Sequence, residues 1–306
     1  MNFTESLHLY LLHKKAIGLA ISTLQNYERF VTNFFDFISE NYQVDDVKKI
    51  DTVMVSTYIV SLSKRMKKVS VRDYFIAIKS LFGYLEHSNI ISVNPFTNMK
   101  TPKKSRRIIP SFSPQDIKKI LSAYDKNTFL GIRNYTIMAT LFSTGIRKTE
   151  LINLHLTNIF IDSNLITIVG KGDKERVIPL SPVYKKILLT YLRKRHNYIK
   201  ERNERDTGFL FINNRCEKIG QGVIEKLFYD LRCDYSFSKT RVSAHTFRHT
   251  FAKTFILNGG DVFTLQKILG HEDITTTRIY IDLNKNEIKA QNDKFNPLDN
   301  PSWQYY

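Results

Sequence analysis

The stretch that decides the fold class is Leu165-Ile-Thr-Ile-Val-Gly-Lys-Gly-Asp-Lys-Glu-Arg-Val-Ile-Pro-Leu180. Its two ends are rich in β-branched residues, and the glycine-containing segment between them, residues 170–174, is typical of a turn. We expect two strands, residues 165–169 and 176–180, joined as an antiparallel hairpin, with residues 159–161 as a candidate third strand. The pattern predicts a mainly α-helical protein with a small antiparallel β-sheet in its C-terminal domain.

Helical patterns surround this hairpin and define a second domain that begins at residue 111. Ser113-Pro114 is typical of a helix start. Apolar residues at helical spacing predict helices over 114–125 and 131–143. Gly145 occupies the place of the left-handed residue that closes a helix, so we expect another helix to begin directly after it. Most of the chain from residue 181 onward is predicted to be helical.

The first hundred residues contain helical patterns only. We expect a bundle of four helices, in which the first spans residues 3–15 and the others are capped by Ser22 or Thr23, by Asp51 and by Ser70. Asn94-Pro95 ends the bundle, because the residue before a proline avoids helical geometry. The basic segment that follows, Lys100–Pro110, is framed by prolines and is predicted to be a linker.

The chain is strongly basic. It carries 46 Lys and Arg against 29 Asp and Glu, a net charge of +17, and residues 101–306 hold 34 of the basic and 20 of the acidic side chains. This charge favours polyanions, with nucleic acid as the first candidate and an anionic membrane surface as the second. No run reaches the ~18 apolar residues of a membrane span, and the N-terminus does not resemble a signal peptide. Two cysteines without a secretory signal predict a reduced, cytoplasmic protein.

Two motifs place an arginine at the start of a predicted helix. In Thr-Gly-Ile-Arg-Lys-Thr-Glu-Leu (144–151), Arg147 and Glu150 are three residues apart and share a face. This spacing alone fits a surface ion pair, but the Thr-Gly turn favours an arginine aimed at a phosphate, with Glu150 behind it. In Ala-His-Thr-Phe-Arg-His (244–249), His245 and Arg248 occupy a first helical turn, where backbone N–H groups favour an anion.

The second motif also raises the question of a metal. His245 and His249 have the i,i+4 spacing of metal ligands, but position 246 is threonine where a zinc peptidase motif needs glutamate. We therefore predict no metal site. Phenylalanine repeats every four residues from position 247, which predicts the core side of this helix and directs Arg248 away from the core.

Three further polar residues belong to this pattern. Lys171 and its competitor Lys174 lie in the predicted turn of the hairpin, where a lysine by itself indicates only a solvated turn residue. His271 directly follows Gly270, which closes the preceding helix and turns the imidazole out of the helix line. Tyr280 is distinguished from the other tyrosines by its place nine positions after His271.

The order Arg…Lys…His-x-x-Arg…His…Tyr over residues 147–280 resembles the tyrosine recombinase (phage integrase) family, and the chain looks most like its short, Xer-like members. The divergent tail and the high basicity favour a recombinase from a mobile element. The resemblance implies two lobes and a linker: a helical, SAM-like core-binding domain that binds DNA (1–99), the basic linker (100–110) and a mixed α/β catalytic domain (111–306) with a C-terminal tail (281–306).

The resemblance also implies a reaction, in which the Tyr280 hydroxyl attacks a DNA phosphate and forms a 3′-phosphotyrosyl bond. Arg147 and Arg248 would bind the non-bridging oxygens, where charge develops in the transition state. His245 would accept the tyrosine proton, and Lys171 would protonate the leaving 5′-oxygen.

The remaining assignments are also implied by the resemblance. His271 would hydrogen-bond the phosphate, and Glu150 would orient Arg147. The covalent ester stores the bond energy, so no ATP, metal ion or other cofactor is expected. The implied partner is double-stranded DNA carrying a specific recombination site, bound by a tetramer that assembles on two sites through the tail. Candidate DNA contacts are Lys67, Lys68, Arg72, Lys79, Arg106 and Arg107.

Two other functions are compatible with parts of this pattern. A type IB topoisomerase uses similar chemistry to nick and reseal one duplex, although the small helical N-terminal lobe argues against it. A catalytically silent DNA-binding regulator with a relic site is the other alternative, and the intact set of polar residues argues against it.

Overall fold

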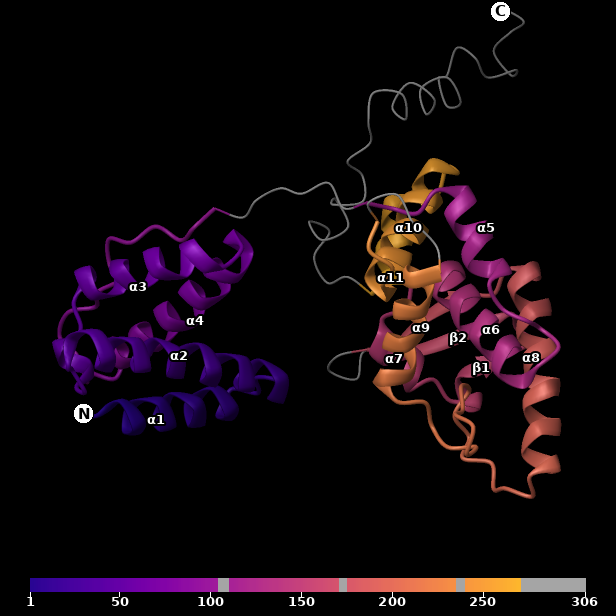
Figure 1. Ribbon diagram of the computed structural model, residues 1–306, viewed down its shortest axis with the longest axis horizontal. Helices are drawn as coiled ribbons and strands as arrows, with labels where there is room; N and C mark the ends of the chain where they lie inside the picture. The colour runs from indigo at the N-terminus through magenta and orange to yellow at the C-terminus, as the bar shows by residue number, and fades with distance from the viewer. Residues whose placement is uncertain (104–109, 171–174, 235–239, 271–306) are drawn as a thin grey trace, which may run out of the picture. The chain divides into compact units, whose positions relative to one another are not determined.

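The computed structural model describes residues 1–103, 110–170, 175–234 and 240–270 (Figure 1). These residues are mainly helical and include a small antiparallel sheet, so the predicted fold class is confirmed. The chain divides into two compact units, residues 1–107 and 108–306, and the division lies inside the basic segment 100–110.

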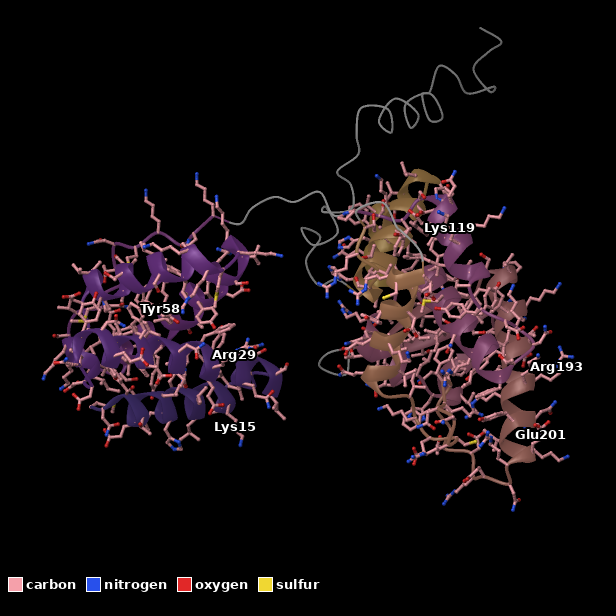
Figure 2. All side chains as sticks on the ribbon, in the orientation of Figure 1. Lys15, Arg29, Tyr58, Lys119, Arg193 and Glu201 are labelled. Atoms are coloured by element: carbon pink, nitrogen blue, oxygen red, sulfur yellow. The ribbon has the colours of Figure 1, made fainter. Side chains whose placement is uncertain are left out.

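Residues 1–103 form a bundle of four α-helices: α1 (Phe3–Ala16), α2 (Ile21–Tyr42), α3 (Thr52–Arg65) and α4 (Lys68–His87), with a 3₁₀ turn at Val47–Lys49. α4 packs against each of the other three helices. The core is aromatic: Phe34 meets both Tyr58 and Phe82 in edge-on contacts. Figure 2 shows Tyr58 inside this unit. The bundle therefore has a hydrophobic core of its own.

Two predicted helix starts in this bundle are wrong. α2 begins after Ala20 rather than at Ser22 or Thr23, and α4 begins after Lys67 rather than at Ser70. Neither Ala20 nor Lys67 makes a side-chain cap bond. The packing of an amphipathic face contributes more to such long helices than a single cap, so the helices extend past the polar candidates.

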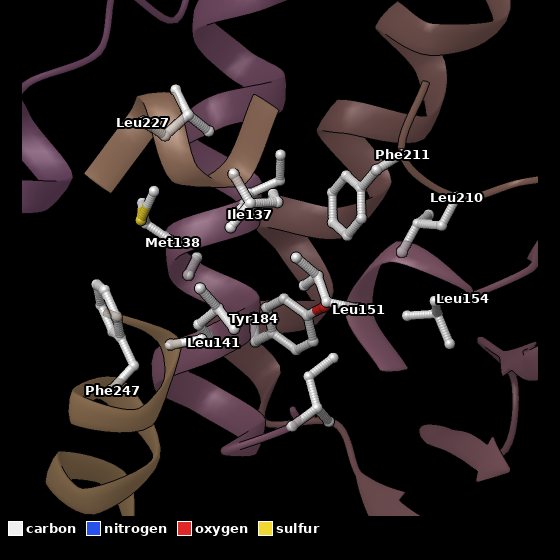
Figure 3. Close-up of a cluster of buried hydrophobic side chains, with 14 of the residues drawn as sticks. Ile137, Met138, Leu141, Leu151, Leu154, Tyr184, Leu210, Phe211, Leu227 and Phe247 are labelled. Atoms are coloured by element: carbon white, nitrogen blue, oxygen red, sulfur yellow. The ribbon is translucent and has the colours of Figure 1, made fainter. Parts of the chain in front are cut away.

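The C-terminal unit is built around α6 (Phe129–Thr144), which is buried along most of its length. The helices that contact α6 are α5 (Pro114–Ser122), α7 (Lys148–Ile152), α8 (Pro182–Glu201) and α10 (Ala244–Leu257). α9 (Gln221–Asp234) packs against α7, and α11 (Val262–Leu269) packs against α10. Figure 3 shows Leu141 of α6 near Tyr184 of α8 and Phe247 of α10 in the shared core.

The described residues of this unit also contain one sheet, in the order β1 (Ile159–Phe160), β2 (Leu165–Val169) and β3 (Glu175–Pro179), after a 3₁₀ turn at Leu156–Asn158. The strands are antiparallel, and Ile166 pairs with Ile178. Both isoleucines are buried, so this face of the sheet covers the core. α11 packs against β3, which brings the hairpin next to the C-terminal helices.

The described helices give no indication of a membrane segment, since none of them combines the length and the apolar character needed to cross a bilayer.

Candidate active site

Arg147 and Glu150 lie at the start of α7, where Arg147 is the N-cap residue. The backbone N–H of Arg147 donates to Oε2 of Glu150 (2.7 Å), and Nη1 of Arg147 donates to Oε1 (2.8 Å). The side chain of Glu150 is only 7% exposed, whereas that of Arg147 is 44% exposed. Glu150 therefore lies behind Arg147, as the spacing predicts, and the guanidinium keeps a surface that faces solvent.

Gly145 determines the turn that leads into Arg147. Its φ of +60° closes α6 in the left-handed conformation, which confirms the predicted helix end. A Cβ at this position would lie 2.6 Å from Cδ1 of Phe251 and 3.0 Å from Cδ2 of Leu269. The turn is therefore packed tightly against α10 and α11, and only glycine fits there without a shift.

Arg248 of α10 holds two helix ends together. Its Nη1 donates to the carbonyl of Gly145 (2.8 Å), and its Nη2 donates to the carbonyl of Leu269 (2.6 Å). These carbonyls close α6 and α11, and the C-terminal end of a helix favours a cation. The expectation that Arg248 lies away from the core is wrong, because its side chain is buried among these backbone acceptors.

His245 lies in the first turn of α10, which is capped by Ser243. Its side chain keeps an exposed surface. Partial desolvation lowers the pKa of His245, and the positive charges of Arg248 and Arg147 lower it further. The imidazole is therefore neutral at pH 7 and able to accept a proton. Arg248 binds the carbonyl of Gly145, two residues before Arg147, and His245 lies three residues before Arg248 on α10, so the three residues belong to one site.

Sequence spacing did not reveal Arg176 of β3, although it contacts this site directly. Its Nη1 and Nη2 donate to Oε1 and Oε2 of Glu150 at 3.0 and 2.6 Å, and its Nε donates to the carbonyl of Ile268 (2.7 Å). A signal was present in the strand pattern: Arg176 lies two residues before the buried Ile178, on the face of the strand that covers the core. An arginine at an inward position needs a buried partner.

Glu150 is ionised in this environment. Burial raises the pKa of its carboxyl, but the hydrogen bonds from Arg176 and from Arg147 outweigh burial and lower the pKa to about 2. The carboxylate of Glu150 thus binds the guanidinium groups of both Arg147 and Arg176. Among the described residues, no group of three or more His, Cys, Asp or Glu could hold a metal ion.

Three of the predicted catalytic residues, Lys171, His271 and Tyr280, lie outside the described residues, as do Arg106 and Arg107. The structure describes the residues directly before Lys171 and directly before His271. Val169 pairs with Glu175 at the end of the hairpin that contains position 171. Leu269 and Gly270, at the end of α11, lead directly into position 271.

The predicted DNA contacts in the N-terminal unit differ in their surroundings. Lys67 and Lys68 are exposed at the start of α4. Nη1 of Arg72 instead donates to the carbonyl of Pro102 (3.0 Å), and Nζ of Lys79 donates to the carbonyl of Met99 (3.2 Å). These two side chains hold the segment after the bundle against α4. Contact with DNA remains a prediction for all of them.

Comparisons with known proteins cover both units. The phage integrase family matches residues 110–287, and the phage integrase N-terminal SAM-like domain matches residues 7–89. The tyrosine recombinase XerD of Listeria innocua is 30% identical over 297 residues, which cover 96% of this chain and 97% of that protein.

Solved structures of DNA-bound proteins are also similar. The XerH site-specific recombinase bound to a palindromic difH substrate matches with a TM-score of 0.75 and 21% identity, over 92% of this chain and 82% of the other. A lambda integrase dimer bound to a COC′ core site matches with a TM-score of 0.70 and 18% identity, over 92% and 96% of the two chains. At these identities, the likeness demonstrates a shared fold.

Proposed function

The chain belongs to the phage integrase family, and we propose that it cuts and rejoins DNA at a specific site through a covalent bond between Tyr280 and a 3′-phosphate. It is a tyrosine-type site-specific DNA recombinase. The observation that carries the assignment of its site is the hydrogen bond from Arg248 to the carbonyl of Gly145, 103 positions away. This bond brings the second arginine motif to the turn from which Arg147 projects.

Binding of the phosphate is assigned to the two arginines. Arg147 has an exposed guanidinium whose orientation is held by Glu150, and Arg248 is fixed by two backbone carbonyls. A guanidinium stays charged at every working pH and donates paired hydrogen bonds to phosphate oxygens. Donors that are already oriented stabilise the charge that develops on the non-bridging oxygens without a reorganisation cost. We assign His271 to the same phosphate.

Two proton transfers complete the reaction. The neutral imidazole of His245 takes the phenol proton as the oxygen of Tyr280 attacks phosphorus. The bond from phosphorus to the 5′-oxygen breaks, and Lys171 gives that oxygen a proton. Attack by the 5′-hydroxyl of another strand reverses these steps, releases Tyr280 and joins new partners. The number of phosphodiester bonds is conserved, so no ATP is required.

A suicide substrate tests the nucleophile directly. On a nicked duplex that loses a short 5′ fragment after cleavage, the wild-type protein should form a covalent complex that survives denaturing electrophoresis. Tyr280→Phe should abolish this complex. Tyr229→Phe is the matched control, since Tyr229 is 59% exposed on α9 and lies outside the motifs. A covalent band from Tyr280→Phe would place the nucleophile elsewhere. The reaction should also persist in EDTA.

The alternative functions make different predictions in the same assays. A type IB topoisomerase would relax supercoiled DNA and yield no recombinant product, and a silent regulator would bind DNA without a covalent complex. The matches to recombinase domains over both units favour recombination.

We further propose that the active assembly is a tetramer on two DNA sites, held together through the tail, residues 281–306, which lie outside the described residues. Deleting this tail should convert the paired-site complex in native electrophoresis into complexes on single sites. An unchanged paired-site complex would contradict the role of the tail. Action on a mobile element and a cytoplasmic location remain predictions, and sequencing the DNA that flanks the gene tests the first.

A further inference from the structure

We propose that Arg176 is a positioning residue that holds Arg147 and the backbone entering position 271 in a fixed relation, by clamping both Glu150 and the end of α11 with one guanidinium. The inference rests on the proposed function of this site. It concerns a residue of strand β3 that lies outside the motifs from which the site was predicted.

The contacts of Arg176 join two parts of the chain. Its Nη1 and Nη2 form a paired interaction with the Glu150 carboxylate, and its Nε donates to the carbonyl of Ile268, 92 positions away. The side chains of Arg176 and Glu150 are both buried, so solvent screens these bonds weakly. A planar guanidinium that makes bonds along two edges has little freedom to rotate.

The charges indicate why a second arginine serves the carboxylate. Each oxygen of Glu150 accepts one hydrogen bond from Arg147 and one from Arg176. The three side chains together carry one net positive charge. Because the buried Arg176 takes up much of the negative charge of Glu150, the exposed guanidinium of Arg147 is oriented without being neutralised. Its charge is then available to a phosphate.

The end of α11 is held from two sides. Arg176 binds the carbonyl of Ile268, and Arg248 binds the carbonyl of Leu269. Gly270 follows in the left-handed conformation, and a Cβ there would lie 2.9 Å from Cδ of Arg176. The backbone that leads to position 271 therefore lies against the side chain of Arg176. A shift of Arg176 would move both this backbone and the carboxylate that orients Arg147.

Single-turnover cleavage of a pre-bound suicide substrate measures this role. Arg176→Met should lower the cleavage rate on the order of 10²-fold, as expected for small displacements in an active site. Affinity for uncleaved site DNA should change much less. The matched control is Arg195→Met: Arg195 is also buried, pairs with Asp206 and binds backbone carbonyls, but it lies on α8, outside the motifs. This control should lower the melting temperature and leave the cleavage rate of the folded protein unchanged.

A double-mutant cycle separates positioning from stability. If Arg176 acts in large part through Glu150, Arg176→Met should cost much less cleavage in a Glu150→Gln background than in the wild type. Additive losses, or a loss no larger than that of Arg195→Met, would overturn the inference. Should Arg176→Met fail to fold, Arg176→Lys, which keeps the charge without the fork, enters the same cycle with Arg195→Lys as its control. A wild-type protein without a covalent product would instead contradict the proposed function itself.

Discussion

At the scale of single residues, Glu150 accepts four hydrogen bonds, two from Arg147 and two from Arg176. Removing one member of a buried ion pair is costly, because the partner's charge remains without compensation. The same bonds make the folding stability of this unit depend on pH through the ionisation of Glu150. They lower the pKa of its carboxyl from the ordinary value of 4.5 to about 2, against the effect of burial.

The pH dependence of stability follows from this shift. The ionised carboxylate is favoured in the folded state, so its contribution is fully present above pH 4.5 and is lost as the pH falls towards 2. The lowered pKa corresponds to a contribution of about 3 kcal/mol to the free energy of unfolding at neutral pH. Urea unfolding at pH 7, 5, 4 and 3 should show the stability difference between wild type and Glu150→Gln shrinking below pH 4.5.

A matched control isolates this effect. Glu225 is exposed and pairs with Lys148, so Glu225→Gln should change stability by less than about 1 kcal/mol at each of these pH values. A wild-type advantage over Glu150→Gln that is as large at pH 3 as at pH 7 would show that Glu150 is not ionised by its arginine partners.

At the scale of elements, the site is assembled from the ends of helices. α6 ends at Gly145, α11 ends at Gly270, and Arg248 of α10 binds a carbonyl at each end. Both glycines adopt the left-handed conformation in contact with a side chain from another element. The ends of α6 and α11 therefore fix the position of Arg248, and the end of α6 also fixes the turn that leads to Arg147.

Gly145→Ala should therefore disturb both folding and chemistry. Its Cβ would meet Cδ1 of Phe251 at 2.6 Å, and the left-handed conformation alone costs an alanine about 1 kcal/mol. We expect a loss of stability of about 2–3 kcal/mol, by analogy with overpacked cores, and a lower cleavage rate, since the carbonyl bound by Arg248 moves.

Gly222→Ala provides the comparison for this change. Gly222 lies in α9 of the same unit, and its Cβ would meet nothing within 4 Å. Alanine should stabilise this helix by up to about 1 kcal/mol. Thermal unfolding and single-turnover cleavage of both variants test the difference. A Gly145→Ala protein that is as stable and active as Gly222→Ala would contradict the role of this turn.

At the scale of the whole molecule, two units with separate hydrophobic cores are joined by a basic segment. Because each core draws its residues from one unit, we expect each unit to unfold cooperatively by itself. If both units contact DNA, as we propose, the tethered pair should bind more tightly than either unit alone, because the second contact is intramolecular.

Separating the units tests this view. Residues 1–107 and 108–306, expressed apart, should each show one thermal transition. At equal salt, the full chain should bind site DNA at least about 100-fold more tightly than either unit, and its affinity should fall more steeply with salt because it contacts more phosphates. An equimolar mixture of the two units is the control and should not restore full affinity. Equal affinity of unit 108–306 and the full chain would contradict a contribution from the bundle.

Local sequence alone determined the fold class and the ends of several helices. The caps Asp51 and Ser113 and the closing residues Gly145 and Gly270 are found as predicted. These features depend on backbone geometry and hydrogen bonds within a few residues. The pairing of Arg147 with Glu150 could be predicted for the same reason, since both lie in one helical turn.

Only the tertiary structure decided what the arginines and their distant partners do. Arg248 is buried because the ends of two other helices present their carbonyls to it, and Arg176 reaches the carbonyl of Ile268 because α11 packs against β3. Arg72 binds a backbone carbonyl thirty positions away. Such contacts arise from the way whole elements pack, and the spacing of residues within one element carries no information about the partner that another element supplies.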